Sequence, residues 1–123
     1  MYHIPGRSVF KIEVDTQLRI AEKTPHFVGI KHALEDHILV TEMIQKLGPN
    51  FRIFAGLEEF IISMMAIGAL GAMNALGNVA PRKIADLCNA ALACDMIMAR
   101  KFHFENEPLV QSFLIQERRY EAG

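Results

Sequence analysis

Lys31 is the residue of this chain whose type and setting best suit it to chemistry. It follows a short apolar run at 27–30 and opens a polar turn at 32–36. A lysine at the mouth of a buried strand would be half desolvated, and desolvation disfavours the charged ammonium. The neutral amine is a nucleophile that forms Schiff bases with carbonyl compounds. The alternative is a strand-end lysine that points into water, which is where most lysines lie.

A second group of side chains near Lys31 could be drawn as a metal site. It combines His32 and His37 with Glu35 and Asp36. The two histidines are five positions apart, which is not the spacing of two ligands on one helix face. We therefore expect these residues to bind no metal, and we expect the protein to use no cofactor.

The two cysteines, Cys88 and Cys94, lie six positions apart in an apolar segment. That setting predicts small buried residues, and it does not suggest a disulfide framework. Neither cysteine has a candidate base beside it in the sequence, so we do not expect a catalytic thiol.

Composition limits the class of protein. The chain has 123 residues, of which 51% are hydrophobic and 22% charged, as expected for one globular domain. A net charge of −1 provides no basic surface for nucleic acid or for a membrane. The most apolar stretch, 60–80, contains two asparagines and three glycines, which favours a buried helix and strand over a membrane span. The first residues do not form a secretory signal, so we expect a cytoplasmic protein.

The elements that must position Lys31 alternate between short strands and amphipathic helices. We predict strands near 27–31, 51–55 and 70–74. Asp15, Asp36 and Asp95 are candidate N-caps, and Pro81 suits the first turn of a helix. The predicted helices span 15–23, 36–47, 58–67, 81–91 and 95–102, with a polar, frayed tail at 116–123.

The order of these elements predicts parallel strands joined by right-handed crossovers. The strand runs are continuously apolar, so we expect helices to cover the sheet on both faces. Three strands are too few for a complete (β/α)₈ barrel, which typically needs about 250 residues. The pair Gly68 and Gly71 lacks the third glycine of a dinucleotide-binding motif and is more consistent with packing at a strand end.

Four short motifs carry a family resemblance. The chain resembles the dihydrodipicolinate synthase and N-acetylneuraminate lyase superfamily in their order and spacing, over nearly its whole length to about Phe113. The four motifs are Tyr2-His3-Ile4-Pro5-Gly6-Arg7, Val28-Gly29-Ile30-Lys31, Gly56-Leu57-Glu58-Glu59, and Gly68-Ala69-Leu70-Gly71 followed by Gly77-Asn78-Val79-Ala80-Pro81.

Members of that family are (β/α)₈ barrels, commonly tetrameric. They are class I aldolases that join pyruvate or a related 2-oxo acid to an aldehyde, or cleave the product. The resemblance therefore implies an α/β fold that is part of a TIM barrel, roughly strands 6–8 with their helices. It implies one partial domain over 1–123, the C-terminal half of a family barrel, with 114–123 as a divergent tail.

The resemblance also implies roles for individual residues. Lys31 matches the lysine that forms the imine with the 2-oxo acid, and Tyr2 matches the tyrosine that relays protons. Arg7 matches the arginine that binds the carboxylate of the second substrate in synthase-type members, for which a planar guanidinium is suited. Gly56 matches a substrate-binding position in the loop after the seventh strand. Arg7 favours a synthase-like member over a sialic-acid lyase, which usually lacks it.

The sequence also departs from the family pattern. His3 stands where an asparagine often follows the tyrosine, and the segment 32–36 differs from the usual acidic-small-small pattern. Because of these two differences, the resemblance does not identify the second substrate. The family loop Gly-x-(Thr/Ser)-(Thr/Gly)-Glu, which holds the 2-oxo acid carboxylate, has no counterpart in this sequence, and 116–120 replace an Asn-Pro-x-Pro segment.

Two functions remain open on the sequence. The first is a Schiff-base-forming lyase or synthase acting on a pyruvate-like 2-oxo acid and an aldehyde. The second is a non-catalytic half-barrel that only self-associates or pairs with a separate chain supplying the N-terminal half. An incomplete parallel sheet has open edges that invite pairing, so we expect a homo-oligomer. The chain by itself is expected to be inactive or nearly so.

Overall fold

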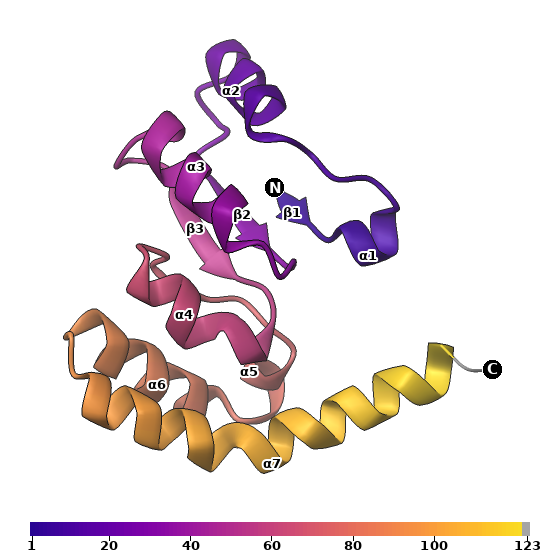
Figure 1. The fold of residues 1–123 in the computed structure, drawn as a ribbon, viewed down its shortest axis with the longest axis vertical. Coiled ribbons are helices and arrows are strands. Elements are labelled where there is room, and N and C mark those ends of the chain that lie inside the picture. Colours follow the sequence, from indigo (N-terminus) through magenta and orange to yellow (C-terminus); the bar gives the residue numbers. More distant parts are fainter. Residues whose placement is uncertain (122–123) are drawn as a thin grey trace.

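A computed structural model describes the backbone of residues 1–121 and the side chains of residues 1–114. Its centre is one sheet of four parallel strands in the order β1-β2-β3-β4. Figure 1 labels the first three of these strands. The strands are β1 (Tyr2–His3), β2 (Gly29–His32), β3 (Arg52–Ala55) and β4 (Gly71–Ala72). The helices are α1 (Pro5–Ser8), α2 (Val14–Lys23), α3 (His37–Leu47), η1 (Glu58–Phe60), α4 (Ile61–Ala66), α5 (Leu76–Val79), α6 (Pro81–Leu92) and α7 (Met96–Glu121).

The predicted parallel pairing of consecutive strands is confirmed. The sheet has one strand more than predicted, because Tyr2 and His3 pair with Lys31 and His32. The last strand is shorter than the predicted 70–74. Its register pairs with β3 are those of Gly71 and Ala72, with flanking backbone hydrogen bonds donated by Leu70 and Met73 to β3 carbonyls. The Asn74 side chain then accepts a hydrogen bond from Gly77 N at 3.1 Å where the chain turns.

Helix boundaries follow the capping residues in most places. The Asp36 carboxylate accepts a hydrogen bond from Leu39 N at 2.8 Å and so caps α3, as predicted. Pro81 opens α6, and Asp95 accepts from Met98 N at 3.1 Å at the start of α7. The prediction that Asp15 is an N-cap is wrong: α2 begins at Val14, after Glu13, and Asp15 lies inside its first turn.

Side chains alternate between the two faces of the sheet. One face is buried under the helices: Ile30, Ile53 and Ala55 belong to the hydrophobic core, and the histidines at 3 and 32 are buried on the same face. The other face carries Tyr2, Lys31, Arg52 and Phe54, with Val28 and Met73 about half exposed beside them. The expectation that helices cover both faces is therefore wrong for the part of the chain that the structure describes.

The last helix is much longer than predicted. It was expected to end at Phe102, but α7 continues to Glu121 and packs along α6 (Figure 1). Apolar side chains continue to contact the core beyond that point, at Leu109, Val110 and Phe113. The expected frayed tail is helical as far as Glu121, and residues 122–123 lie outside the described residues.

The cysteines only partly follow the prediction. Cys88 is half-buried on α6, and burial raises the pKa of its thiol, which disfavours the reactive thiolate. Cys94 is exposed, so its predicted burial is wrong. It lies just after α6 with a left-handed backbone conformation, φ 58°, where the chain turns into α7. The two thiols are free.

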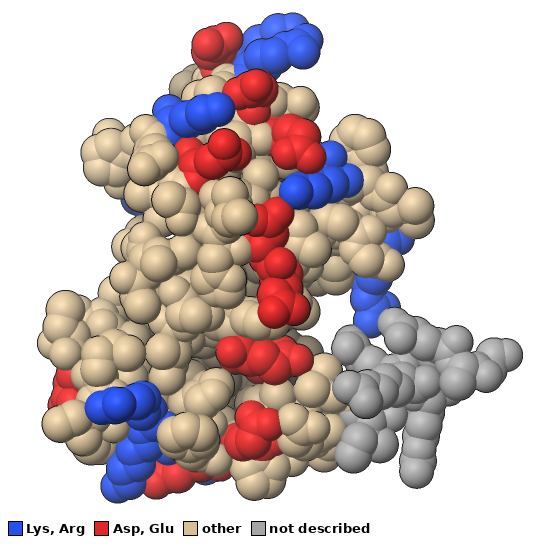
Figure 2. Space-filling model, in the orientation of Figure 1, with Lys and Arg blue, Asp and Glu red and all other residues tan. Residues whose placement is uncertain are grey.

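Charged side chains of both signs are interspersed over the face shown in Figure 2, with broad uncharged areas between them. Among the described residues, no helix has the length and apolar character needed to cross a membrane. The same residues contain no cluster of three histidine, cysteine or acidic side chains able to hold a metal ion.

Candidate functional site

A pocket of about 300 Å³ lies at the carboxyl-terminal ends of the strands. In parallel α/β folds this end of the sheet is where catalytic side chains gather. The pocket brings together all four residues that the sequence singled out: Tyr2, Arg7, Lys31 and Gly56. They come from β1, α1, β2 and the loop after β3, so sequence positions 54 residues apart meet at one site.

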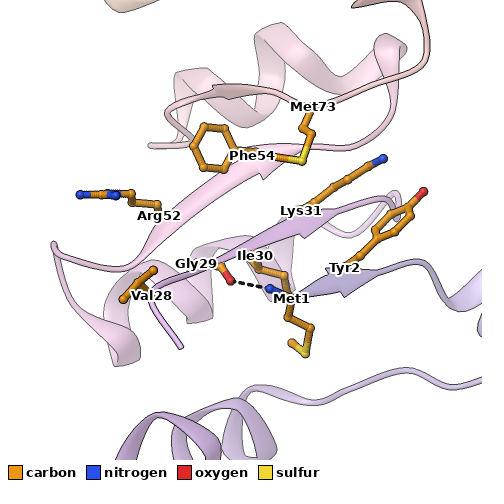
Figure 3. A pocket seen from close by; sticks show the side chains of 9 residues that line it. All are labelled: Met1, Tyr2, Val28, Gly29, Ile30, Lys31, Arg52, Phe54 and Met73. Atoms are coloured by element: carbon orange, nitrogen blue, oxygen red, sulfur yellow. Dashed lines mark hydrogen bonds between the residues drawn. The ribbon is translucent and has the colours of Figure 1, made fainter. Parts of the chain in front are cut away.

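Lys31 and Tyr2 form the centre of this pocket. They are register partners on β1 and β2, so their side chains leave the sheet on the same face. The Lys31 Nζ atom lies 3.9 Å from the centroid of the Tyr2 ring, within range of a cation–π interaction (Figure 3). Lys31 is half-buried, which lies between the desolvated and the fully solvated lysine that the sequence left open.

Arg7 reaches the same pocket from the short helix α1. Pro5 occupies the first turn of that helix, where its fixed φ is compatible with helical backbone. This turn follows β1 directly and brings the Arg7 guanidinium to the wall of the pocket that holds Lys31. Arg7 and Lys31 thus bring two basic side chains to a cavity that the acidic Glu58 and Glu59 also line.

Gly56 has a packing role that the structure explains. Its amide donates to the His32 carbonyl at 2.8 Å, which draws the loop after β3 against the end of β2. A Cβ atom added at Gly56 would lie 2.7 Å from the Ala33 Cβ and 3.0 Å from the His32 carbonyl oxygen. The close approach of two backbone segments therefore requires glycine here.

Gly56→Ala is expected to lower the free energy of unfolding by about 1–3 kcal/mol, because the added methyl group overpacks against backbone atoms. Urea unfolding followed by circular dichroism measures this. Gly6→Ala is the matched control, since a Cβ at Gly6 meets nothing within 4 Å, and it should change stability by less than about 0.5 kcal/mol. Equal effects of the two substitutions would contradict the packing role.

Glu58 is a site residue whose partner the sequence did not predict. The sequence placed it in the family motif at 56–59 and at the start of a predicted helix. Its carboxylate also accepts a hydrogen bond from Leu76 N at 2.8 Å, which ties the loop after β3 to α5. Since Glu58 also lines the pocket, it holds two walls of the site together.

The far wall of the pocket comes from α7, through Val110, Phe113 and Leu114. These residues were missed because the helix was predicted to end at Phe102. Their spacing of three and four positions is the signal that could have found them, because it places three apolar side chains on one helix face.

A second hollow of about 570 Å³ lies on the open face of the sheet. Tyr2 and Lys31 line both hollows and so stand between them. Figure 3 shows the other lining residues, Met1, Val28, Gly29, Ile30, Arg52, Phe54 and Met73. Most of this lining is apolar, so the open face is better suited to packing against protein than to remaining in water.

Comparison with known proteins places these features in a wider group. Residues 1–121 match the model of the dihydrodipicolinate synthetase family. A 4-hydroxy-tetrahydrodipicolinate synthase from Thermus thermophilus is 38% identical over 104 residues, which are 85% of this chain and 35% of that protein. The corresponding synthase from Aquifex aeolicus is 31% identical over 94% of this chain and 40% of its own length.

Solved structures agree with these matches. The crystal structure of dihydrodipicolinate synthase from Aquifex aeolicus matches 93% of this chain with a TM-score of 0.89 and 32% identity. The synthase of Methylacidiphilum fumariolicum SolV matches the same share with a TM-score of 0.88 and 31% identity. The chain covers 39% and 38% of these two structures, and about 35–40% of the curated relatives it matches. The four-stranded sheet is thus part of a TIM barrel.

Proposed function

Because this chain belongs to the dihydrodipicolinate synthetase family, we propose that it carries the imine-forming part of a Schiff-base lyase or synthase. Its substrates would be a pyruvate-like 2-oxo acid and an aldehyde, and its chemistry would need no cofactor. The chain spans about 35–40% of its relatives, so turnover is proposed for a completed barrel. A cytoplasmic location belongs to the same proposal.

The observation that supports this most directly is the contact between Lys31 and Tyr2. The Lys31 amine would attack the ketone carbon of the 2-oxo acid, and loss of water would leave an imine. The imine withdraws electrons, so a proton can leave the neighbouring carbon to give an enamine that attacks the aldehyde. The Tyr2 hydroxyl, on a ring that contacts Lys31, would carry protons in these steps.

Arg7 is the residue that favours a synthase over a sialic-acid lyase in this proposal. A guanidinium binds a carboxylate through two parallel hydrogen bonds, so Arg7 would hold the carboxylate of the aldehyde substrate. The pocket supports this role because it places Arg7 and Lys31 on the same cavity. Gly56 would contribute by letting the loop after β3 approach β2, which shapes the substrate-binding wall.

Borohydride reduction in the presence of pyruvate tests the proposal. The reduced adduct is stable, so digestion and mass spectrometry can locate it. We expect a single adduct on Lys31. A chain that forms no adduct with pyruvate or with other small 2-oxo acids would contradict the proposed chemistry.

A second candidate function is assembly without catalysis, favoured by the apolar open face of the sheet. Val28 and Met73 on this face are 54% and 53% exposed. At the two edges, β1 and β4 pair on one side alone among the described strands. Such a sheet would be completed by a second copy of the chain or by a chain supplying the N-terminal half of the barrel.

The assembly prediction is a homodimer or larger oligomer of the purified chain, because burial of the open face removes apolar side chains from water. Analytical ultracentrifugation at micromolar concentration measures it. Val28→Asp places a charge on the open face and should shift the chain towards the monomer, whereas Arg19→Asp on the outside of α2 should not. A compact, folded monomer of the unaltered chain would contradict the prediction.

A further inference from the structure

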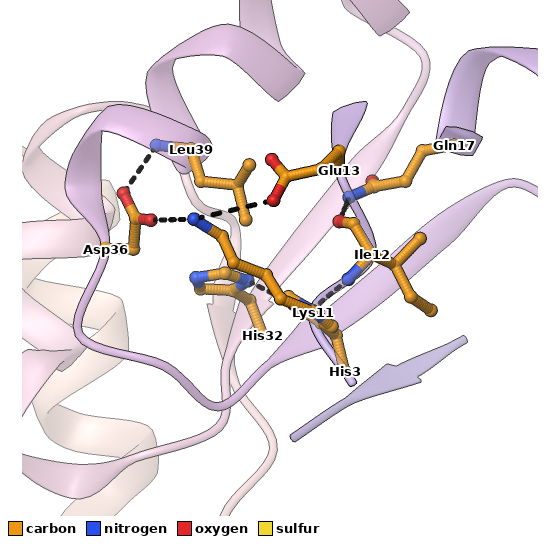
Figure 4. A network of polar contacts seen from close by, with 8 residues as sticks. All are labelled: His3, Lys11, Ile12, Glu13, Gln17, His32, Asp36 and Leu39. Atoms are coloured by element: carbon orange, nitrogen blue, oxygen red, sulfur yellow. Dashed lines mark hydrogen bonds and ion pairs between the residues drawn. The ribbon is translucent and has the colours of Figure 1, made fainter. Parts of the chain in front are cut away.

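Two histidines meet on the buried face of the sheet, directly behind the Tyr2 and Lys31 pair. His3 and His32 are register partners on β1 and β2 and are only 1% and 0% exposed. Their Nδ1 atoms lie 3.2 Å apart, and their ring centroids are 5.2 Å apart (Figure 4). Both histidines lie at positions where the sequence differs from the family pattern. The two differing positions are far apart in the sequence but in contact in the structure.

The surrounding hydrogen bonds determine where the protons of this pair lie. The Ile12 amide donates to His3 Nε2 at 3.0 Å, and a backbone amide can only donate. His3 Nε2 is therefore an acceptor, and the proton of the neutral ring lies on Nδ1. That proton is donated to His32 Nδ1, so neutral His32 carries its own proton on Nε2. His32 Nε2 is buried without a hydrogen-bond partner among the described residues.

The hydrogen bond between the two histidine side chains adds to the backbone hydrogen bonds that join the short strand β1 to β2. Strand β1 has two residues, and the contacts beside it are hydrogen bonds from the Met1 amino group to Gly29 O at 3.0 Å, from Lys31 N to Met1 O at 2.8 Å and from Ala33 N to His3 O at 2.9 Å. The bond from Ile12 to His3 also anchors the segment after α1. The Gln17 side chain holds the same residue by donating to the Ile12 carbonyl at 3.1 Å.

We propose that the His3–His32 hydrogen bond is a positioning contact that locks β1 and β2 in the register holding the Tyr2 ring beside Lys31. Neighbouring side chains on a strand point to opposite faces, so a contact between His3 and His32 behind the sheet sets the relation of Tyr2 to Lys31 in front of it. Loss of the contact would let β1 shift, and the tyrosine would no longer lie against the amine.

The lock works only while both rings are neutral. A proton added to His32 would go to its Nδ1 atom, so the two Nδ1 atoms would each carry an N–H and face each other without an acceptor. A proton added to His3 would go to its Nε2 atom, which would then face the Ile12 amide donor. The charged and titratable groups around the pair are Lys11, Glu13, Asp36 and His37. Lys11 binds Asp36 at 2.9 Å and lies 3.9 Å from Glu13, so these carboxylates are largely engaged by the lysine. Burial lowers the pKa of both His3 and His32, which keeps the pair neutral at neutral pH.

Nitrogen NMR of the imidazole rings in the full 123-residue chain tests the assignment. We expect His3 protonated on Nδ1 and His32 protonated on Nε2 at neutral pH. The opposite tautomer at His3, or a charged ring at either position, would overturn the proposal. This measurement needs no variant and no reaction.

The positioning role is tested with two variants of His32. His32→Asn keeps an acceptor oxygen near the place of Nδ1, and His32→Leu removes the acceptor. The readout is the nuclear Overhauser contact between the Tyr2 ring and the Lys31 ε-methylene, with its ring-current shift. We expect His32→Asn to keep both signals and His32→Leu to lose them while the rest of the spectrum stays folded. His26→Asn, at an exposed histidine, is the control and should keep both.

A folded His32→Leu chain with an unchanged Tyr2–Lys31 contact would overturn the positioning role. If His32→Leu does not fold, the same comparison is made with His3→Leu and His3→Asn, and the tautomers of the unaltered chain decide the proton assignment. Pyruvate trapping should slow by about tenfold in His32→Leu, because a displaced reacting group loses rate. Failure of the unaltered chain to trap pyruvate would count against the proposed function alone, since the NMR readouts do not depend on it.

Discussion

Lys31→Ala is expected to abolish the pyruvate adduct that borohydride traps on this chain. Only an amine can form the imine, and Lys31 is the lysine that the pocket places against Tyr2. Lys46→Ala is the matched control and should leave the adduct unchanged, because Lys46 lies on α3 and pairs with Asp15 at 3.2 Å. Mass spectrometry of the reduced, digested protein measures both.

Two further variants separate chemistry from folding in this experiment. Lys31→Arg keeps a cation over the Tyr2 ring but should give no adduct, because a guanidinium does not form the imine. Tyr2→Phe keeps the ring and removes the hydroxyl, so the adduct should still form, about a hundredfold more slowly. An adduct on Lys11 or Lys46 would mean that the family motifs have been matched to the wrong residues.

Acid is expected to destabilise the protein in a pH range set by His32. Burial, with a smaller contribution from His3, lowers the pKa of His32 from 6.5 to about 4. Above pH 6.5 neither the folded nor the unfolded state binds a proton at this ring. Below pH 6.5 the unfolded state does, so stability is lost as the pH falls to about 4. The loss should be on the order of 3 kcal/mol in the free energy of unfolding.

Urea unfolding across this pH range measures the effect. His32→Asn has no titratable ring at this position, so its stability should depend less steeply on pH, whereas His26→Asn should keep the full slope. His3 acts in the same direction, since burial lowers its pKa as well. The hydrogen bond from Lys11 lowers the pKa of Asp36, so the stability that this carboxylate contributes is lost only below its ordinary pKa of 3.8. That loss occurs at lower pH than the effect of His32, so the two effects can be told apart. Parallel profiles for the unaltered and His32→Asn chains would contradict the prediction.

Local sequence was sufficient to predict the elements that depend on nearby residues. Asp36 can cap a helix because its carboxylate reaches an amide three positions away, and Pro81 begins α6 because its backbone already has the required φ. The spacing of strands and helices, without hairpin turns, was enough to predict a parallel sheet. The family motifs were sufficient to select Tyr2, Arg7, Lys31 and Gly56, which the structure brings to one pocket.

Other features were decided only by tertiary structure. The position of α7 beyond Phe102 depends on packing against α6 and the core, which the apolar spacing of Val110, Phe113 and Leu114 indicates but does not by itself determine. The covering of one sheet face rather than both depends on where the described helices pack. The bond between Glu58 and Leu76 joins residues 18 positions apart, so it exists only once the loops after β3 and β4 are side by side.

The histidine pair shows the same division most clearly. The sequence by itself determined that two histidines replace or extend family motifs, 29 positions apart. The parallel register of β1 and β2 decided that they touch, and the Ile12 amide decided which nitrogen carries the proton. The sequence alone determines which residues are histidines and how far apart they are along the chain. A hydrogen bond between two strands depends on the register, and the register is set by all the contacts that hold the sheet together.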